Sequence, residues 1–192
     1  MTTRDEALAI VRQYVKNENL VRHMLAVEAC MGLYAKKFGE DEHLWRTAGL
    51  LHDFDWEIHP DLEHHPQAGA PILKEKGIAE EVIQIILSHA DHTGVPRDTL
   101  VRKALCACDE ITGLVTACVL VRPSRSIYDL KVSSVKKKWK DKRFAAGANR
   151  EEMETAISEF GVEQWEHVGN VISAMQDIAG DLGLEGELEK PG

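Results

Sequence analysis

The chain has 192 residues, 44% of them hydrophobic and 29% charged, with a formal net charge of −9 at pH 7. This length and balance are typical of a globular protein with one hydrophobic core. The excess of acidic residues argues against a general nucleic-acid binder, because such proteins gather Lys and Arg to neutralise phosphates. We therefore expect no nucleic-acid polymer among its partners, and a small anionic ligand would need a locally positive site.

No apolar run approaches the ~20 residues that span a bilayer, and the first six residues are polar rather than typical of a signal segment. We expect a soluble, cytoplasmic protein with no membrane partner, either a monomer or a homodimer. Four cysteines fall in predicted helix interiors: Cys30, Cys106, Cys108 and Cys118. Buried thiols explain them better than a cysteine-ligated zinc site, because the two side chains of a Cys-x-Cys pair point to different faces of a helix.

Apolar residues recur at helical spacing through most of the chain, and alternating β-branched patterns are scarce. The predicted fold class is therefore all-α, a single-domain helical bundle. Asn19 is a candidate N-cap for the second helix, which should end before Gly39, and Pro123 stops the long helix that precedes it. The predicted helices cover residues 3–14, 20–38, 41–52, 67–76, 79–89, 100–120 and 162–179.

Two polar segments, 54–66 and 90–99, contain prolines and lack apolar periodicity, which predicts loops. The last ten residues are rich in Gly and charge, which is typical of a frayed end. The predicted organisation is an N-terminal helix packing on the core (1–19), a main helical domain (20–125), C-terminal flanking helices (126–182) and a flexible tail (183–192).

Histidines and acidic residues gather at predicted helix ends and in the adjoining loops. His52 and Asp53 end an apolar helix, and an imidazole beside a carboxylate offers the nitrogen and oxygen donors that suit Mn, Fe or Zn. The Asp53 carboxylate could bridge two such ions. A His-Asp pair alone could equally cap a helix, so the metal prediction depends on further residues.

Asp109 is the most telling of these further residues. It lies among Leu105, Ile111 and Leu114 on a helix apolar enough to be buried, and a buried carboxylate needs a metal, a partner charge or a raised pKa. His23, His65 and His89 are the other candidates.

The order of His23, His52-Asp53 and Asp109 resembles the signature of the HD superfamily of metal-dependent phosphohydrolases. The resemblance covers about residues 20–125. It implies a helical bundle of the HD-domain type with the metal held inside the bundle.

A further resemblance points to the two-metal branch of this superfamily, which includes the HD-GYP proteins. The segments "HPQAGAPIL" and "SHADHTGVP" resemble those that supply its second metal, through His65 and His89, and "VRPSR" resembles its Arg-Pro-x-Arg segment. The chain departs from that branch at two places. Trp56 replaces a lysine, and the Gly-Tyr-Pro segment is degenerate, shortened to Gly94-Val95-Pro96, so cyclic dinucleotide hydrolysis is not implied.

The resemblance implies a hydrolase that attacks a small phosphate ester, such as a nucleotide or a related phosphomonoester or diester, with a metal-bound hydroxide. One or two divalent ions are expected: Mn, Fe, Co or Zn, with Mg as a further option. The predicted metal ligands are His23, His52, Asp53, His65, His89 and Asp109. The predicted catalytic residues are Asp53, Asp55 and His92. The predicted substrate-binding residues are Arg122, Arg125 and Lys131, and a guanidinium fork suits phosphate.

Two alternatives stay open at this point. Some members of the HD superfamily hold two irons with much the same ligands and use dioxygen, so the ligands alone do not separate an oxygenase from a hydrolase. A non-catalytic metal-binding HD signalling module is the other alternative, and the complete set of candidate ligands argues against it.

Overall fold

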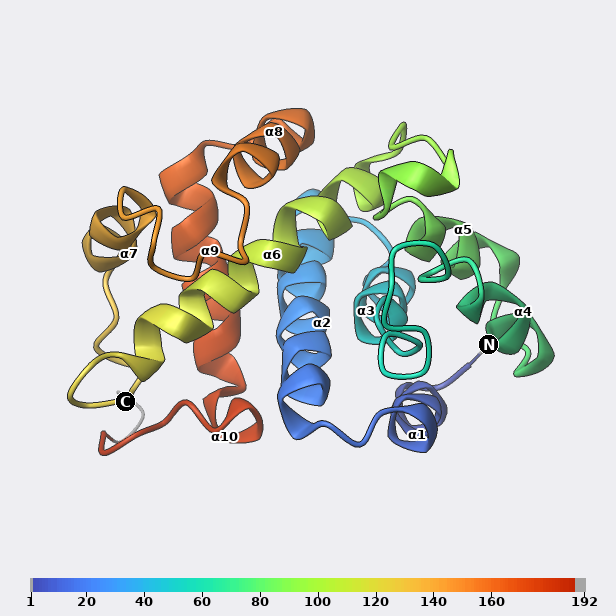
Figure 1. Cartoon of the computed structure of the whole chain (residues 1–192), viewed down its shortest axis with the longest axis horizontal. Coiled ribbons are helices and arrows are strands. Elements are labelled where there is room, and N and C mark those ends of the chain that lie inside the picture. Colours follow the sequence, from blue (N-terminus) through green and yellow to red (C-terminus); the bar gives the residue numbers. More distant parts are fainter. Residues whose placement is uncertain (1, 189–192) are drawn as a thin grey trace. The chain divides into compact units, whose positions relative to one another are not determined.

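The computed structural model describes residues 2–188 of the chain. Helices are the regular elements of this part, which contains no strand, so the predicted all-α class is confirmed. The chain divides into two compact units, the first ending at Leu105 and the second beginning at Cys106. Helix α6 (Leu100–Leu120) begins in the first unit and ends in the second (Figure 1). None of the described helices is long and apolar enough to cross a membrane.

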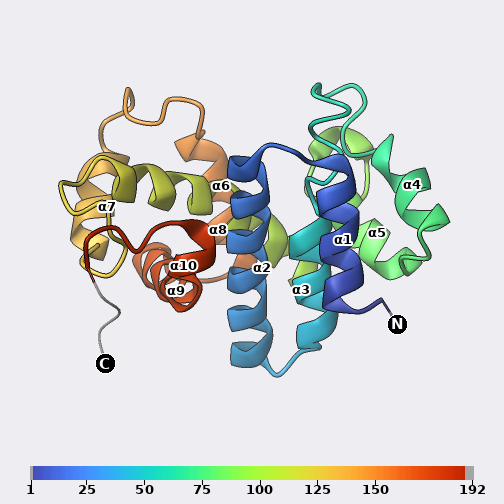
Figure 2. The same ribbon diagram turned by 90° about the horizontal axis from the view of Figure 1, so that it is seen from below.

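Helix α3 is the centre of the first unit. It contacts α1, α2 and α5, while α4 contacts α5, and Figure 2 shows α3 beside α1 and α2. The elements of this unit are α1 (Arg4–Tyr14), α2 (Glu18–Phe38), α3 (Glu42–Leu51), α4 (Gly69–Glu75), α5 (Glu80–Leu87) and a 3-10 turn, η1 (Asp91–Thr93).

Local sequence signals fix the ends of these helices. Thr3 and Glu6 form a reciprocal capping box at the start of α1. The side chain of Asn17 caps α2 by accepting from the backbone N–H of Asn19, so the prediction of Asn19 as the cap was wrong by two residues. Gly39 ends α2 in the left-handed conformation, with φ 73°, as predicted.

The core of the first unit is mostly apolar, and it includes one ion pair between α1 and α2. Trp45 and Tyr34 are fully buried, as are Met24 and Leu51. Glu28 on α2 is only 2% exposed. Arg4 of α1 donates two hydrogen bonds to its carboxylate, at 2.6 and 2.9 Å, and thereby ties α1 to α2.

The segment between α3 and α4 is a chain of turns, as predicted for residues 54–66. Phe54 anchors it, with its ring edge-on to Tyr14 of α1 at a centroid distance of 5.6 Å. Glu57 accepts hydrogen bonds from the backbone N–H groups of Lys16 and Asn17, which also lowers the pKa of Glu57. These contacts hold the turns against the start of α2.

Helix α9 (Gln164–Asp177) is the centre of the second unit and contacts α7 (Val132–Trp139), α8 (Arg150–Phe160) and α10 (Ala179–Leu182) (Figure 1). His167 on α9 is fully buried and donates to the Ala107 carbonyl of α6 at 2.8 Å. Leu184, within the predicted tail, is buried, and its carbonyl accepts from Ile127. The remainder of that predicted tail, 189–192, lies outside the described residues.

A candidate metal centre

Asp53, directly beyond the end of α3, lies between two pairs of histidines. Its Oδ2 atom is 3.6 Å from His23 Nε2 and 3.5 Å from His52 Nε2. Its Oδ1 atom is 3.3 Å from His65 Nε2 and 3.7 Å from His89 Nε2. Each carboxylate oxygen therefore faces one pair of imidazole nitrogens.

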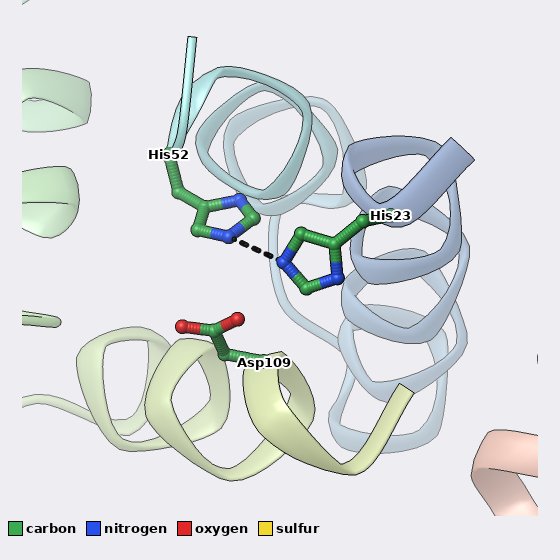
Figure 3. A group of neighbouring side chains, drawn as sticks. All are labelled: His23, His52 and Asp109. Carbon is green, nitrogen blue, oxygen red and sulfur yellow. Dashed lines mark hydrogen bonds between the residues drawn. The ribbon is translucent and has the colours of Figure 1, made fainter. Parts of the chain in front are cut away.

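The four histidines come from different elements of the first unit. His23 lies on α2 and His52 follows α3, with their Nε2 atoms 3.2 Å apart, the contact that Figure 3 draws as a dashed line. His65 precedes α4 and His89 follows α5, with their Nε2 atoms 3.1 Å apart. Two imidazole Nε2 atoms this close to each other can bind the same cation.

Hydrogen bonds to the other ring nitrogen orient two of these imidazoles. His52 Nδ1 donates to the Gly49 carbonyl at 2.9 Å, and His89 Nδ1 donates to the Ile86 carbonyl at 2.5 Å. A carbonyl can only accept, so the proton of each neutral ring lies on Nδ1 and the Nε2 lone pair points toward Asp53. Such an orienting bond is typical of metal-ligating histidine.

His65 is held by a carboxylate instead. Its Nδ1 atom is 2.8 Å from Asp55 Oδ1, and both side chains are buried. Burial lowers the pKa of His65, but the hydrogen bonds and charges of Asp53 and Asp55 outweigh burial and raise it to about 9. The negative potential that raises this pKa also favours a divalent cation.

The donor set fits a divalent transition metal. Asp53, His65 and His89 each offer a ligand atom within 4.8 Å of the others. A mixture of imidazole nitrogen and carboxylate oxygen suits Mn, Fe, Co and Zn. The second predicted acidic ligand, Asp109, is half-buried on α6 in the second unit.

The two other predicted catalytic residues, Asp55 and His92, both contact His65. Asp55 is fully buried and meets the ring nitrogen that points away from Asp53. This placement does not support proton transfer from Asp55 to a leaving group, because solvent and substrate do not reach it. His92, on η1, is exposed, and its Nε2 atom lies 2.9 Å from the His65 carbonyl.

The three predicted substrate-binding residues belong to the second unit. Arg122 is engaged with Asp129, through Nε at 3.1 Å and Nη2 at 2.7 Å, and this pairing raises the pKa of Arg122. The guanidinium group of Arg122 therefore fixes the conformation of the loop before α7. Arg125 is exposed with a positive φ of 48°, and Lys131 is exposed at the start of α7.

Sequence reasoning missed Arg97 and Gly69. Arg97 donates to the carbonyls of Ser88 and His89, at 3.0 and 3.1 Å, and so fixes the backbone that carries the His89 imidazole. A methyl group at Gly69 would lie 2.7 Å from Asp55 Cγ. No local sequence signal marks Arg97, whereas Gly69 lies within the quoted segment "HPQAGAPIL", although its contact with Asp55 is made only by the fold.

Comparison with known proteins defines the class to which this site belongs. Residues 20–114 match the family model described as HD domain. This segment of the chain is therefore an HD domain, and HD domains bind divalent metals. The match includes His23, His52, Asp53 and Asp109, which carried the resemblance.

Several similar curated proteins are named Ribonuclease Y. That of Oleidesulfovibrio alaskensis is 31% identical over 98 residues, which are 50% of this chain and 18% of that protein. Those of Nitratidesulfovibrio vulgaris (33% over 98 residues) and Rhodopirellula baltica (34% over 91 residues) cover 50% and 46% of this chain, and 18% and 17% of those proteins. The chain thus spans less than a fifth of the length of these relatives. No solved structure matches it.

These findings support the predicted class of enzyme, a metal-dependent hydrolase. They contradict the prediction that excluded a nucleic-acid polymer, because the similar proteins are named as ribonucleases. That prediction used the charge of the whole chain, whereas polynucleotide binding depends on local charge. The assignments to the HD-GYP branch and to a degenerate Gly-Tyr-Pro segment remain predictions.

Proposed function

We propose that this chain is a metal-dependent phosphohydrolase that holds two divalent ions on either side of Asp53. One ion would be held by His23, His52 and Asp53, with Asp109 completing the set. The other would be held by Asp53, His65 and His89. The position of Asp109 within the matched HD domain supports its inclusion.

The observation that carries this proposal is that the two oxygen atoms of the Asp53 carboxylate face different pairs of histidines. One oxygen faces the His23 and His52 pair, and the other faces the His65 and His89 pair. A single ion bound to Asp53 would account for only one of these two pairs of imidazole nitrogens. A bridging carboxylate is the arrangement that two-metal hydrolases require.

The ions would supply Lewis acidity, lowering the pKa of water toward ~7 and neutralising phosphoryl charge. The chain's own residues would do the rest. Asp53 would fix the separation of the two ions, and the buried rings of His52 and His65 would exclude water from their inner side. His92, exposed and in contact with the His65 carbonyl, would give a proton to the leaving oxygen.

The substrate would be a phosphate ester, and two classes deserve testing. A small ester is the class that the resemblance implies. The ester bond of RNA is the second class, favoured by the name of the relatives. Arg125 and Lys131 are exposed and could hold phosphate, whereas Arg122 would first have to leave Asp129.

The test is a hydrolysis assay of the full chain stripped of metal and reloaded with Mn²⁺. The substrates are bis(p-nitrophenyl) phosphate, p-nitrophenyl phosphate, nucleoside monophosphates and a short single-stranded RNA. We expect Mn²⁺-dependent turnover of at least one ester. Asp53→Asn should lower this turnover by more than about 100-fold. Replacing a residue that only supports a ligand costs up to about 100-fold, and Asp53 is itself a proposed ligand. His64→Gln, at an exposed neighbouring histidine, should leave the turnover unchanged.

The alternatives give different results in the same assay. Bound metal with no turnover of any ester would favour a non-catalytic HD module. Dioxygen uptake by the iron-loaded chain without ester hydrolysis would favour an oxygenase. Either result would overturn the proposal.

A further inference from the structure

We infer that Asp55 is a positioning residue that builds one of the two metal sites by holding His65, and that it sets the metal affinity of that site alone. This inference rests on the proposed function, because it assumes that His65 is a ligand. It assigns Asp55 a role behind the ligand, in place of direct contact with substrate or water.

Both ring nitrogens of His65 contact neighbouring side chains. Nδ1 is 2.8 Å from Asp55 Oδ1, while Nε2 is 3.3 Å from Asp53 Oδ1 and 3.1 Å from His89 Nε2. A carboxylate accepts only, so the proton of the neutral ring lies on Nδ1. The Nε2 lone pair is thereby directed at the place where Asp53 and His89 converge.

The burial of Asp55 shows that it acts through His65. Its side chain is fully buried, and the Oδ2 atom has no hydrogen-bond partner. A buried carboxylate with an unsatisfied oxygen destabilises a fold unless nearby positive charge offsets it. A cation held by His65 would provide that charge through the ring.

Gly69 keeps the carboxylate in place. A Cβ atom there would lie 2.7 Å from both Cγ and Oδ2 of Asp55, so only glycine lets the start of α4 pack this closely. The absence of a side chain at Gly69 therefore leaves the space in which the carboxylate sits beside His65.

The other two oriented imidazoles donate their Nδ1 protons to backbone carbonyls. His52 donates to the Gly49 carbonyl and His89 to the Ile86 carbonyl, both within one helical turn. An anionic acceptor strengthens the hydrogen bond and raises the basicity of the ligand more than a neutral carbonyl does. Asp55 therefore makes the His65 imidazole a more basic ligand than a ring whose Nδ1 donates to a carbonyl, as those of His52 and His89 do.

The experiment is a titration of the metal-free full chain with Mn²⁺, in which the electron paramagnetic resonance signal of free Mn²⁺ reports the unbound ion. It compares the wild type with Asp55→Asn, which keeps an acceptor but loses the charge, and with Asp55→Ala, which loses both. Asp61→Asn is the matched control, because Asp61 Oδ1 lies 2.7 Å from His64 Nδ1 in an exposed pair on the same segment.

We expect the wild type to bind two equivalents. One equivalent should weaken by about 10- to 100-fold in Asp55→Asn and by more in Asp55→Ala, while the other keeps its affinity. Asp61→Asn should match the wild type. A purely structural role would weaken both equivalents equally, and a graded loss confined to one equivalent would not arise from it.

Two results would overturn the inference. If both Asp55 variants bind two equivalents with wild-type affinity, the inference fails while the proposed function stands. If the wild type binds no Mn²⁺, or a single equivalent that the variants leave unchanged, the two-metal proposal fails as well. Circular dichroism identifies an unfolded Asp55→Ala, in which case Asp55→Asn decides the outcome.

Discussion

Asp53 is the residue whose surroundings explain the site. Its type and its position after an apolar helix could be predicted, and so could the set of histidines, because together they offer the donors that suit transition metals and resemble the HD signature. What surrounds Asp55 could not be predicted. Its contact with His65 depends on how the nine intervening residues turn, and no periodic pattern describes such turns. Arg122 was equally unpredictable, because its partner Asp129 arrives through a folded loop.

His92 provides a test of proton transfer at the residue scale. His92→Gln should lower kcat by about 100-fold, the lower limit for a lost general acid, and leave the bound metal unchanged. Steady-state kinetics with a nucleoside monophosphate provide the measurement, because its alkoxide leaving group needs a proton. An unchanged kcat would remove His92 from the mechanism.

The helices were the most predictable part of the fold. Helical periodicity and breakers fixed α6 at residues 100–120, and Gly39 fixed the end of α2. The start of α2 was less certain because the segment offers two asparagines, and the choice of Asn17 depends on which backbone N–H its side chain reaches. Contacts between helices, such as that of Arg4 with Glu28, join residues 24 positions apart in the sequence, so no local sequence pattern predicts them.

That ion pair gives a prediction for the first unit. Arg4→Ala should lower the free energy of unfolding by about 1.5–3 kcal/mol, the range for a hydrogen bond to a charged group, because it leaves Glu28 buried without its partner. Arg12→Ala is the control, since Arg12 pairs with Glu18 at the surface and should cost less than about 1 kcal/mol. Urea unfolding measures both. Equal effects would contradict the structural role given to Glu28.

The contact between α9 and α6 gives a prediction for the second unit. Burial lowers the pKa of His167 from 6.5 to about 4, against the hydrogen bond to Ala107. The unfolded chain therefore takes up a proton first as pH falls. The stability contribution of neutral His167 is complete above pH 6.5 and decreases as pH falls toward 4, by at most about 3 kcal/mol.

His167→Gln isolates this effect, because glutamine can still donate to the Ala107 carbonyl but does not titrate. The comparison of variant and wild type is needed because the pKa of Glu110, raised to about 7 by burial and by Asp109, acts in the opposite direction: its contribution is lost as pH rises through 7. In urea unfolding, the change in the free energy of unfolding from pH 4.5 to pH 7 should be less positive in His167→Gln than in the wild type. An identical dependence in both proteins would contradict the assignment.

At the scale of the whole molecule, composition was informative about class but misleading about partners. A net charge of −9 averages over the chain, whereas residues 131–143 contain seven basic residues and one acidic residue. Local clusters of this kind are what an averaged charge conceals. The HD domain match covers residues 20–114, so the residues beyond it must be understood from their own structure.

The central claim is that the chain holds two metal ions bridged by Asp53. Elemental mass spectrometry of protein purified without chelator tests it most directly, with His65→Ala beside the wild type and His64→Ala as the control. The account predicts about two Mn, Fe or Co ions per wild-type chain, about one in His65→Ala, and two in His64→Ala. A single ion per wild-type chain that His65→Ala leaves in place would contradict it.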